Sequence, residues 1–143
     1  MKRFHFPLGR ALALRRLQRE IERGRMEQAL GHIRKVDALA GEIRAEGEAA
    51  EADVRSSPMD GTQLMALDGF RDYLKRSAAE VERHRLRAES AVNHQRLKLL
   101  EAERGVRVLE KLEAKAQAKW RAAADREVEE FAAEAYLARW KQR

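Results

Sequence analysis

The sequence contains no cysteine and only two prolines, Pro7 and Pro58. Without cysteine the chain can form neither a disulfide nor a thiolate metal site. Because proline interrupts helices, residues 8–57 and 59–143 are free of the strongest helix breaker. The two prolines therefore mark the places where long helices are expected to begin or end.

Large apolar side chains are also scarce. Aromatic residues make up 6% of the chain and charged residues 38%, and 25 of the residues counted as hydrophobic are alanines. This composition excludes a compact globule with a thick core and is typical of a long helix or coiled coil. No apolar run approaches the roughly 18 residues that cross a membrane. Because Arg10, Arg15 and Arg16 interrupt the first apolar stretch, we expect no signal peptide and a cytoplasmic protein.

The formal net charge of +6 is concentrated at one end of the sequence. Residues 1–25 carry eight basic and two acidic groups, whereas the remaining 118 residues carry 22 of each sign. Residues 125–134 have the opposite bias, with five carboxylates and one arginine. An acidic segment near one terminus thus complements a basic segment near the other.

Apolar residues recur at alternating spacings of three and four, as in the seam of a coiled coil. The spacing in the first half predicts a seam of Ala29, Ile33, Val36, Ala40, Ile43, Gly47, Ala50 and Val54, preceded by a seam out of step with it at Leu14, Leu17, Ile21 and Gly24. The second half keeps one register through Leu64, Leu67, Arg71, Leu74, Ala78, Val81, Arg85, Ala88, Val92, Gln95, Leu99, Ala102, Val106, Leu109, Glu113, Ala116, Trp120 and Ala123. The change of step in the first half predicts a local irregularity of the supercoil between residues 24 and 29.

A short polar stretch, SSPMDG at residues 56–61, separates the two patterns. Pro58 disfavours helix at the residue before it, and Gly61 favours a turn. Either Asp60 or Thr62 can cap a helix that follows. The stretch therefore predicts a turn between two helices.

A short loop between two long amphipathic helices gives an antiparallel pair. We therefore predict an all-α fold, a long antiparallel two-helix coiled-coil hairpin that forms a single domain over residues 1–143. Its helices are expected at residues 8–55 and 62–140, with the turn at 56–61.

The two predicted helices differ in length, because a helix rises by about 1.5 Å per residue. Residues beyond roughly 110 would have no partner helix. One possibility is that the second helix breaks near Ser77 and the termini meet. The other is that the last third of the chain overhangs and binds another molecule, and the unbroken second seam favours this overhang.

No residue pattern indicates catalysis or a bound cofactor. The four histidines, His5, His32, His84 and His94, lack a second ligand at a spacing typical of a metal site. Carboxylates are numerous, but a coiled coil has no cleft that would shift their pKa. We expect surface histidines, no catalytic residue, no metal and no cofactor.

The basic first 25 residues allow two interpretations. They could bind nucleic acid or an anionic membrane. Alternatively, Arg15, Arg16, Arg19 and Arg23 could form a solvated face or pair with an acidic protein. No aromatic residue interleaves with these arginines for base stacking, which favours the second interpretation. Phe70 and Tyr73, just past the turn, are expected either to pack beside the seam or to anchor a partner.

Four sequence elements carry a family resemblance. The opening MKRFHFPLGRALALRRLQRE is a basic-aromatic start followed by a leucine-rich helix, with an L-x-L-R core at residues 12–15. An L-E-x-L element stands at residues 109–112, an acidic element EVEEFA at 127–132, and DYLKR at 72–76. In these elements, and in length and layout, the chain resembles the flagellar FliJ family and the related central-stalk proteins of type III secretion. In the acidic element, Arg126-Glu127 stands where that family has Glu-Gln.

The resemblance implies a non-enzymatic, cytoplasmic stalk that is peripheral to the inner membrane. Such a stalk inserts its coiled coil, near the termini, into the hexameric export ATPase, much as the rotary stalk of F-type ATPases does. It promotes assembly and activity of the ring, contacts the export gate protein and can escort substrate chaperones. The candidate partner-binding residues are Arg15, Arg16, Arg19, Phe70, Tyr73, Trp120, Glu127, Glu130, Tyr136 and Trp140. The alternatives are a basic helical rod that binds nucleic acid or anionic membrane, and a purely structural coiled-coil adaptor.

Overall fold

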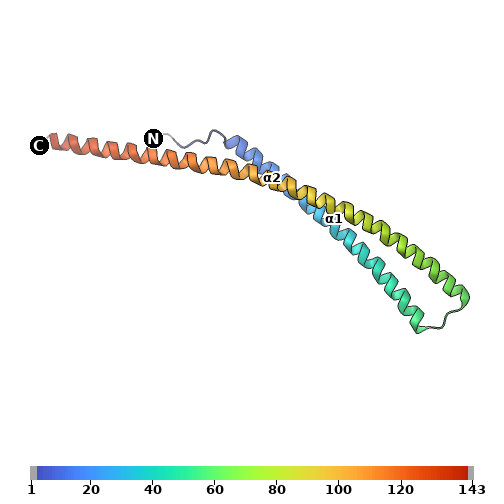
Figure 1. Ribbon diagram of the computed structural model, residues 1–143. Coiled ribbons are helices and arrows are strands. Elements are labelled where there is room, and N and C mark those ends of the chain that lie inside the picture. The colour runs from blue at the N-terminus through green and yellow to red at the C-terminus, as the bar shows by residue number, and fades with distance from the viewer. Residues whose placement is uncertain (1–2, 142–143) are drawn as a thin grey trace. The chain divides into compact units, whose positions relative to one another are not determined.

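The computed structural model describes residues 3–141 and consists of two long helices packed together as a hairpin (Figure 1). Helix α1 spans Gly9–Ser56 and helix α2 spans Gly61–Lys141. No strand occurs among the described residues. The predicted all-α helical hairpin is therefore confirmed.

The helix bounds lie within one residue of those expected from the sequence. Met1, Lys2, Gln142 and Arg143, which belong to the predicted domain, lie outside the described residues. Helix α2 is continuous over 81 residues, so the alternative in which it breaks near Ser77 is wrong. The helix also runs through two internal glycines, each of which costs about 1 kcal/mol relative to alanine.

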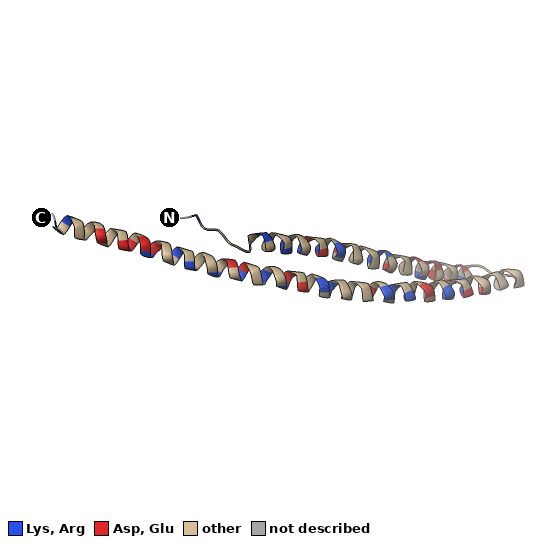
Figure 2. Ribbon diagram, turned by 90° about the horizontal axis from the view of Figure 1, so that it is seen from above, with Lys and Arg blue, Asp and Glu red and all other residues tan. Residues whose placement is uncertain are grey.

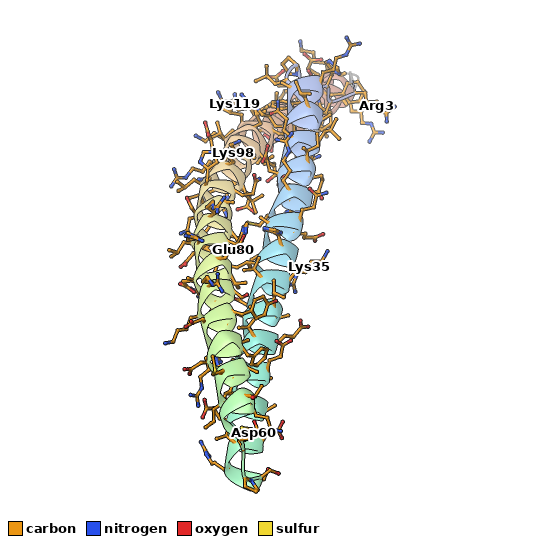
Figure 3. The ribbon with its side chains drawn as sticks, turned by 90° about the vertical axis from the view of Figure 1, so that its right-hand side faces the viewer. Arg3, Lys35, Asp60, Glu80, Lys98 and Lys119 are labelled. Carbon is orange, nitrogen blue, oxygen red and sulfur yellow. The ribbon has the colours of Figure 1, made fainter. Side chains whose placement is uncertain are left out.

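The turn is built from local hydrogen bonds. Helix α1 ends at Ser56, whose hydroxyl donates to the carbonyl oxygen of Asp53 at 3.1 Å, and Pro58 follows two residues later. Asp60, labelled in Figure 3, begins α2 with a reciprocal cap. The backbone N–H of Gln63 donates to Oδ1 of Asp60 at 2.8 Å, and the backbone N–H of Asp60 donates to Oε1 of Gln63 at 3.0 Å. This capping box satisfies two N–H groups that the first turn of a helix leaves open, so Asp60 is the cap.

A second turn precedes α1. The backbone N–H of Gly9 donates to the carbonyl oxygen of Phe6 at 3.1 Å, which places Pro7 at the second position of the turn. Proline suits that position because its ring fixes the required φ. The first helical bond follows, from the N–H of Leu12 to the carbonyl oxygen of Leu8 at 2.9 Å. Both prolines thus stand just outside helices.

The chain packs as two compact units. The terminal unit combines Met1–Ile21 with Leu100–Arg143, and the turn unit is Glu22–Leu99. In the terminal unit the core consists of Phe6, Leu12 and Val106, with Phe4, Leu109 and Ala116 packed against it. In the turn unit the buried apolar side chains are Val36, Val81, Ala88 and Val92.

The seam of α1 keeps one register throughout, which corrects the sequence prediction. Continued backwards from Ala29 in steps of three and four, it passes through Met26, Glu22, Arg19, Arg15 and Leu12, and all of these except Arg15 are buried or half-buried. Leu14, Leu17 and Ile21 are exposed, and so is Gly24, so the predicted N-terminal seam is wrong. The expected irregularity at residues 24–29 is absent from this pattern. The apolar pattern was misleading because the true seam positions are mostly polar.

The seam of α2 follows the predicted register more closely. Its positions are buried or half-buried from Leu67 to Trp120, apart from Ala78. At its two predicted ends, Leu64 and Ala123 are exposed. The second pattern was read correctly because most of its seam positions are apolar.

The register of α1 can be tested by truncating leucines on opposite faces. Leu12 is 3% exposed, whereas Leu17 is 58% exposed. Leu12→Ala removes methyl groups from the core, so we expect it to lower the free energy of unfolding by about 2 kcal/mol. Leu17→Ala is the matched control and should change it by no more than about 0.5 kcal/mol. Urea unfolding followed by far-UV circular dichroism at low protein concentration measures both, and the reverse ranking contradicts this register.

Gly47 offers a second test of the packing. A Cβ at Gly47 would lie 3.6 Å from Cδ1 of Leu74, an ordinary van der Waals distance, whereas nothing lies within 4 Å of a Cβ at Gly41. Both Gly47→Ala and Gly41→Ala should stabilise the protein by about 0.5–1 kcal/mol through helix propensity. We expect the larger rise in Tm for Gly47→Ala, because its methyl group gains a contact. A lower Tm for Gly47→Ala than for Gly41→Ala would mean that the helices approach each other too closely there.

Candidate protein-binding surfaces

Charged side chains occupy several seam positions of the turn unit and pair across it. Nε of Arg71 donates to Oε1 of Glu51 at 2.9 Å, and its Nη2 lies 2.7 Å from the same oxygen. Nε of Arg85 donates to Oδ1 of Asp37 at 3.1 Å, which raises the pKa of Arg85 above its ordinary value. Exposed pairs of this kind contribute little stability. Each pair forms only when its two residues lie opposite each other on α1 and α2, so the pairs favour one register of the hairpin.

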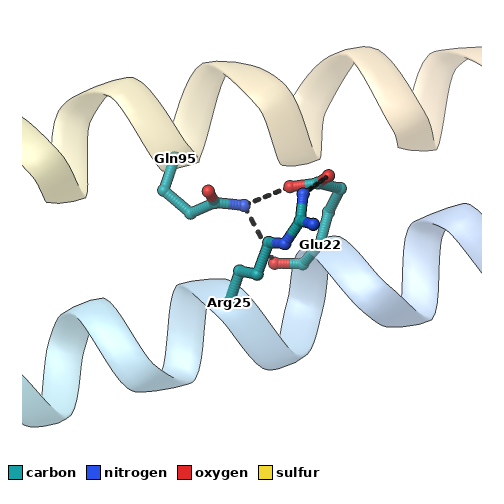
Figure 4. Close-up of polar contacts among 3 residues, drawn as sticks. All are labelled: Glu22, Arg25 and Gln95. Atoms are coloured by element: carbon teal, nitrogen blue, oxygen red, sulfur yellow. Dashed lines mark hydrogen bonds and ion pairs between the residues drawn. The ribbon is translucent and has the colours of Figure 1, made fainter.

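One polar pair is more enclosed. Among the described seam positions, Gln95 is the buried polar residue. Its side-chain amide donates to the carboxylate of Glu22 and also, at 3.2 Å, to the backbone carbonyl oxygen of Glu22 (Figure 4). Nη1 of Arg25 donates to the same carboxylate at 2.9 Å. The hydrogen bond from Gln95 lowers the pKa of Glu22; partial burial raises it, and the charges of Arg25 and Lys98 lower it further. A polar pair at a seam position specifies register, because any slip would leave both groups without partners.

The three candidate arginines of the terminal unit lie at or near α2. The side chain of Arg15 crosses Gly105, where an added Cβ would lie 3.6 Å from its Cδ. Nη2 of Arg16 donates to Oε1 of Glu110 at 3.2 Å. Arg19 sits at a seam position, with its side chain 24% exposed. These arginines therefore differ from a freely solvated basic face.

The N-terminal segment, residues 3–8, precedes α1 and packs on a part of α2 that α1 itself does not reach. The ring of Phe4 lies 5.9 Å from that of Trp120, with an angle of 56° between the ring planes. Trp120, predicted to bind a partner, therefore packs within the hairpin. The expectation that residues beyond roughly 110 lack a partner needs correction, since Ala124 is the last buried residue of α2.

Beyond Ala124 the helix continues without cover. We call residues 125–141 the tail, and every residue in it is exposed. Four predicted site residues lie in it, namely Glu127, Glu130, Tyr136 and Trp140. The aromatic side chains are prominent, with Phe131 74% and Trp140 71% exposed. The overhang expected from the sequence thus exists, but it is shorter than a third of the chain.

The tail carries an excess of negative charge and a stripe of apolar side chains. Its five carboxylates fall within residues 125–134, visible as the red cluster near the C-terminal end of α2 in Figure 2. Within the described residues none of these carboxylates forms an ion pair with α1. Val128, Phe131, Ala135 and Ala138 follow at spacings of three and four, which places them on one face. We call these four residues the tail stripe.

A second exposed apolar surface lies on α1 in the terminal unit. Leu14, Leu17 and Ile21 are spaced three and four apart and share the face opposite Leu12. We call them the outer stripe. The apolar spacing predicts these residues in the seam, whereas the spacing that runs back unbroken from Ala29 to Leu12 identifies them as a surface.

Phe70 and Tyr73 of the turn unit lie together, with ring centroids 6.3 Å apart and nearly parallel planes. Phe70 is half-buried, whereas Tyr73 is exposed and lines a shallow groove of about 350 Å³ with Leu39 and Glu42. Phe70 therefore packs beside the seam, whereas the side chain of Tyr73 is exposed to solvent. Phe70 and Tyr73 belong to the turn unit, whereas the other candidate residues belong to the terminal unit.

Within residues 3–141 no group of three or more histidine, aspartate or glutamate side chains could hold a metal ion. Among the same residues, no helix is both long enough and apolar enough to cross a membrane. Comparisons of the chain with protein-family models, with curated proteins and with solved structures find no match.

The pair of Glu22 and Gln95 predicts a pH dependence of stability. Because the pKa of Glu22 is lowered in the folded state, the stability that its carboxylate supplies is complete at neutral pH. It is lost as the pH falls through the folded-state pKa, below the ordinary value of 4.5. Glu22→Gln should therefore lower the urea midpoint at pH 7, and the gap from the unmodified protein should close as the pH falls into that acidic range.

Glu27→Gln provides the matched control, because Glu27 is exposed on the same helix. We expect its urea midpoint to follow that of the unmodified protein over the whole pH range. An equal loss at neutral pH for both variants would show that the effect comes from net charge rather than from the contact with Gln95.

Proposed function

We propose that this protein is a non-enzymatic central-stalk component of a flagellar or type III export apparatus. In this role it binds and activates the hexameric export ATPase and contacts the export gate protein, and substrate chaperones are further partners. It acts in the cytoplasm, peripheral to the inner membrane.

The exposed tail is the observation that carries this proposal. A helix that continues past the last buried residue leaves Tyr136 and Trp140 in solvent, four residues and about one turn apart on one side of the helix. Large exposed aromatic side chains are the kind that supply most of the binding energy at protein interfaces. A single helix projecting from a hairpin is narrow enough, at about 10–12 Å across with side chains, to enter the axial opening of a ring.

The resemblance to the stalk family supports the same part of the molecule. Of its four elements, residues 72–76 belong to the turn unit, and residues 12–15 and 109–112 belong to the terminal unit. There they lie beside a core contact, that of Leu12 with Val106, and an ion pair, that of Arg16 with Glu110. The third element, residues 127–132, forms the first turns of the tail. The similarity thus includes residues that pack the hairpin and residues that the hairpin leaves exposed.

The alternative of a nucleic-acid or membrane-binding rod gains less from the geometry. Such a rod would use the arginines of residues 1–25 as freely solvated phosphate contacts. Arg15 instead lies across Gly105, and Arg16 is paired with Glu110. The other alternative, a purely structural coiled-coil adaptor, gives no role to the exposed aromatic side chains of the tail.

The proposal is tested by adding the protein to the export ATPase of its own organism. We expect faster ATP hydrolysis and a larger hexamer fraction in analytical ultracentrifugation. The double variant Tyr136→Ala/Trp140→Ala should need at least about tenfold more protein for the same stimulation, since each lost aromatic anchor costs 1 kcal/mol or more.

Met65→Ala serves as the control, because Met65 is 78% exposed in the turn unit and is not a candidate partner-binding residue. It should stimulate the ATPase as well as the unmodified protein does. If neither hydrolysis nor hexamer formation changes when both proteins are folded, the stalk proposal is wrong.

A further inference from the structure

The terminal unit exposes two apolar stripes that nothing in the hairpin covers. The outer stripe, Leu14, Leu17 and Ile21, faces away from the core residue Leu12. The tail stripe runs from Val128 through Phe131 and the two alanines that follow. Each stripe has the spacing of a coiled-coil seam, so each has the geometry to receive one further helix.

The two segments that carry the stripes have opposite net charge. Residues 9–21 of α1 carry four arginines and one glutamate. Arg15, Arg16 and Arg19 lie on the side of α1 that faces α2, and Arg10 lies on the side of the outer stripe. Arg10 precedes Leu14 by four residues, so it extends the same face. The first ten residues of the tail carry five carboxylates and one arginine. Like charges disfavour pairing, so two tails should repel each other, whereas the carboxylates of a tail attract the basic segment that carries Arg10 and the outer stripe.

One chain cannot bring its own two stripes together. The tail begins after Ala124, beyond the point where Phe4 of the N-terminal segment meets Trp120, and it continues as one straight run of helix away from α1 (Figure 1). Contact between the stripes therefore requires a second molecule that carries the complementary stripe. A second copy of this chain carries both.

We propose that the tail of one copy packs on the outer stripe of a second copy, and that the tail of the second packs on the outer stripe of the first. The two contacts are equivalent and close a dimer with two-fold symmetry. Phe131 and Val128 are the apolar side chains that the tail contributes, and Leu17 lies at the centre of the stripe that receives them.

The proposed dimer uses a different side of the tail from the proposed ATPase contact. At 100° per residue, Tyr136 and Trp140 fall well away from the face that holds Val128 and Phe131. The two proposals can therefore fail separately, because one concerns the mass of the protein alone and the other concerns stimulation of the ATPase.

The test is sedimentation equilibrium of the full chain from about 1 µM to about 1 mM, the span of Kd values expected for small interfaces. We expect the mass to rise with concentration from 16.5 kDa towards twice that value. The rise should weaken with added salt, because part of the attraction is between exposed charges. A mass of 16.5 kDa over the whole range overturns the proposal.

Two variants identify the surfaces. Leu17→Glu damages only the outer stripe and Phe131→Glu damages only the tail stripe, and we expect each alone to weaken association at least tenfold. Leu97→Glu, at an exposed leucine of the turn unit, should leave association unchanged. Unchanged helical circular dichroism shows that each variant is folded.

Mixing the two variants discriminates the proposed pairing from tail-to-tail contact. Leu17→Glu keeps an intact tail and Phe131→Glu keeps an intact outer stripe, so a mixed dimer retains one good contact. We expect the mixture to associate more tightly than either variant alone. No gain on mixing, or a loss of association with Phe131→Glu only, overturns the proposed pairing.

Discussion

The hairpin depends on a row of side chains that repeats every three and four residues along both helices. Many members of this row are alanine, glycine or polar residues such as Gln95. At about 25 cal/mol per Å² of apolar surface, such a row buries little stabilising area per turn. The small area buried per turn adds up over the length of the two helices. The polar pairs, above all Glu22 with Gln95, select one register among several in which the alanines could pack.

The fold could be predicted because its determinants are local. Proline outside the helices, a capping residue at the turn and a sustained spacing need no knowledge of distant contacts. The register of α1 before Ala29 could not be read in the same way, because it is set by Phe6 and Val106, which pack on Leu12. Leu14, Leu17 and Ile21 offered a more apolar stripe, yet burying them would have turned Leu12 away from that core.

The sequence predicted which residues of the candidate site are exposed at the end of α2, but it did not predict which candidate residues pack inside the hairpin. The exposure of Tyr136 and Trp140 follows from the unequal helix lengths, which the sequence contains. The placement of Trp120 depended on the irregular segment at residues 3–8, where no periodicity exists to guide a prediction. The arginines presented the same difficulty, since spacing identifies a basic face but not whether a guanidinium lies across a glycine of the neighbouring helix, as Arg15 does.

The continuity of α2 past Ala124 has a thermodynamic consequence for the tail. A free peptide of this length would form little helix in water, because its first turn must be nucleated at a large entropic cost. Here the covered turns at Trp120 and Ala124 already supply a helical end, so each tail residue adds only the smaller cost of propagation. A partner that binds the tail meets a segment already ordered by its neighbour in the chain, and less of the binding energy is consumed in folding it.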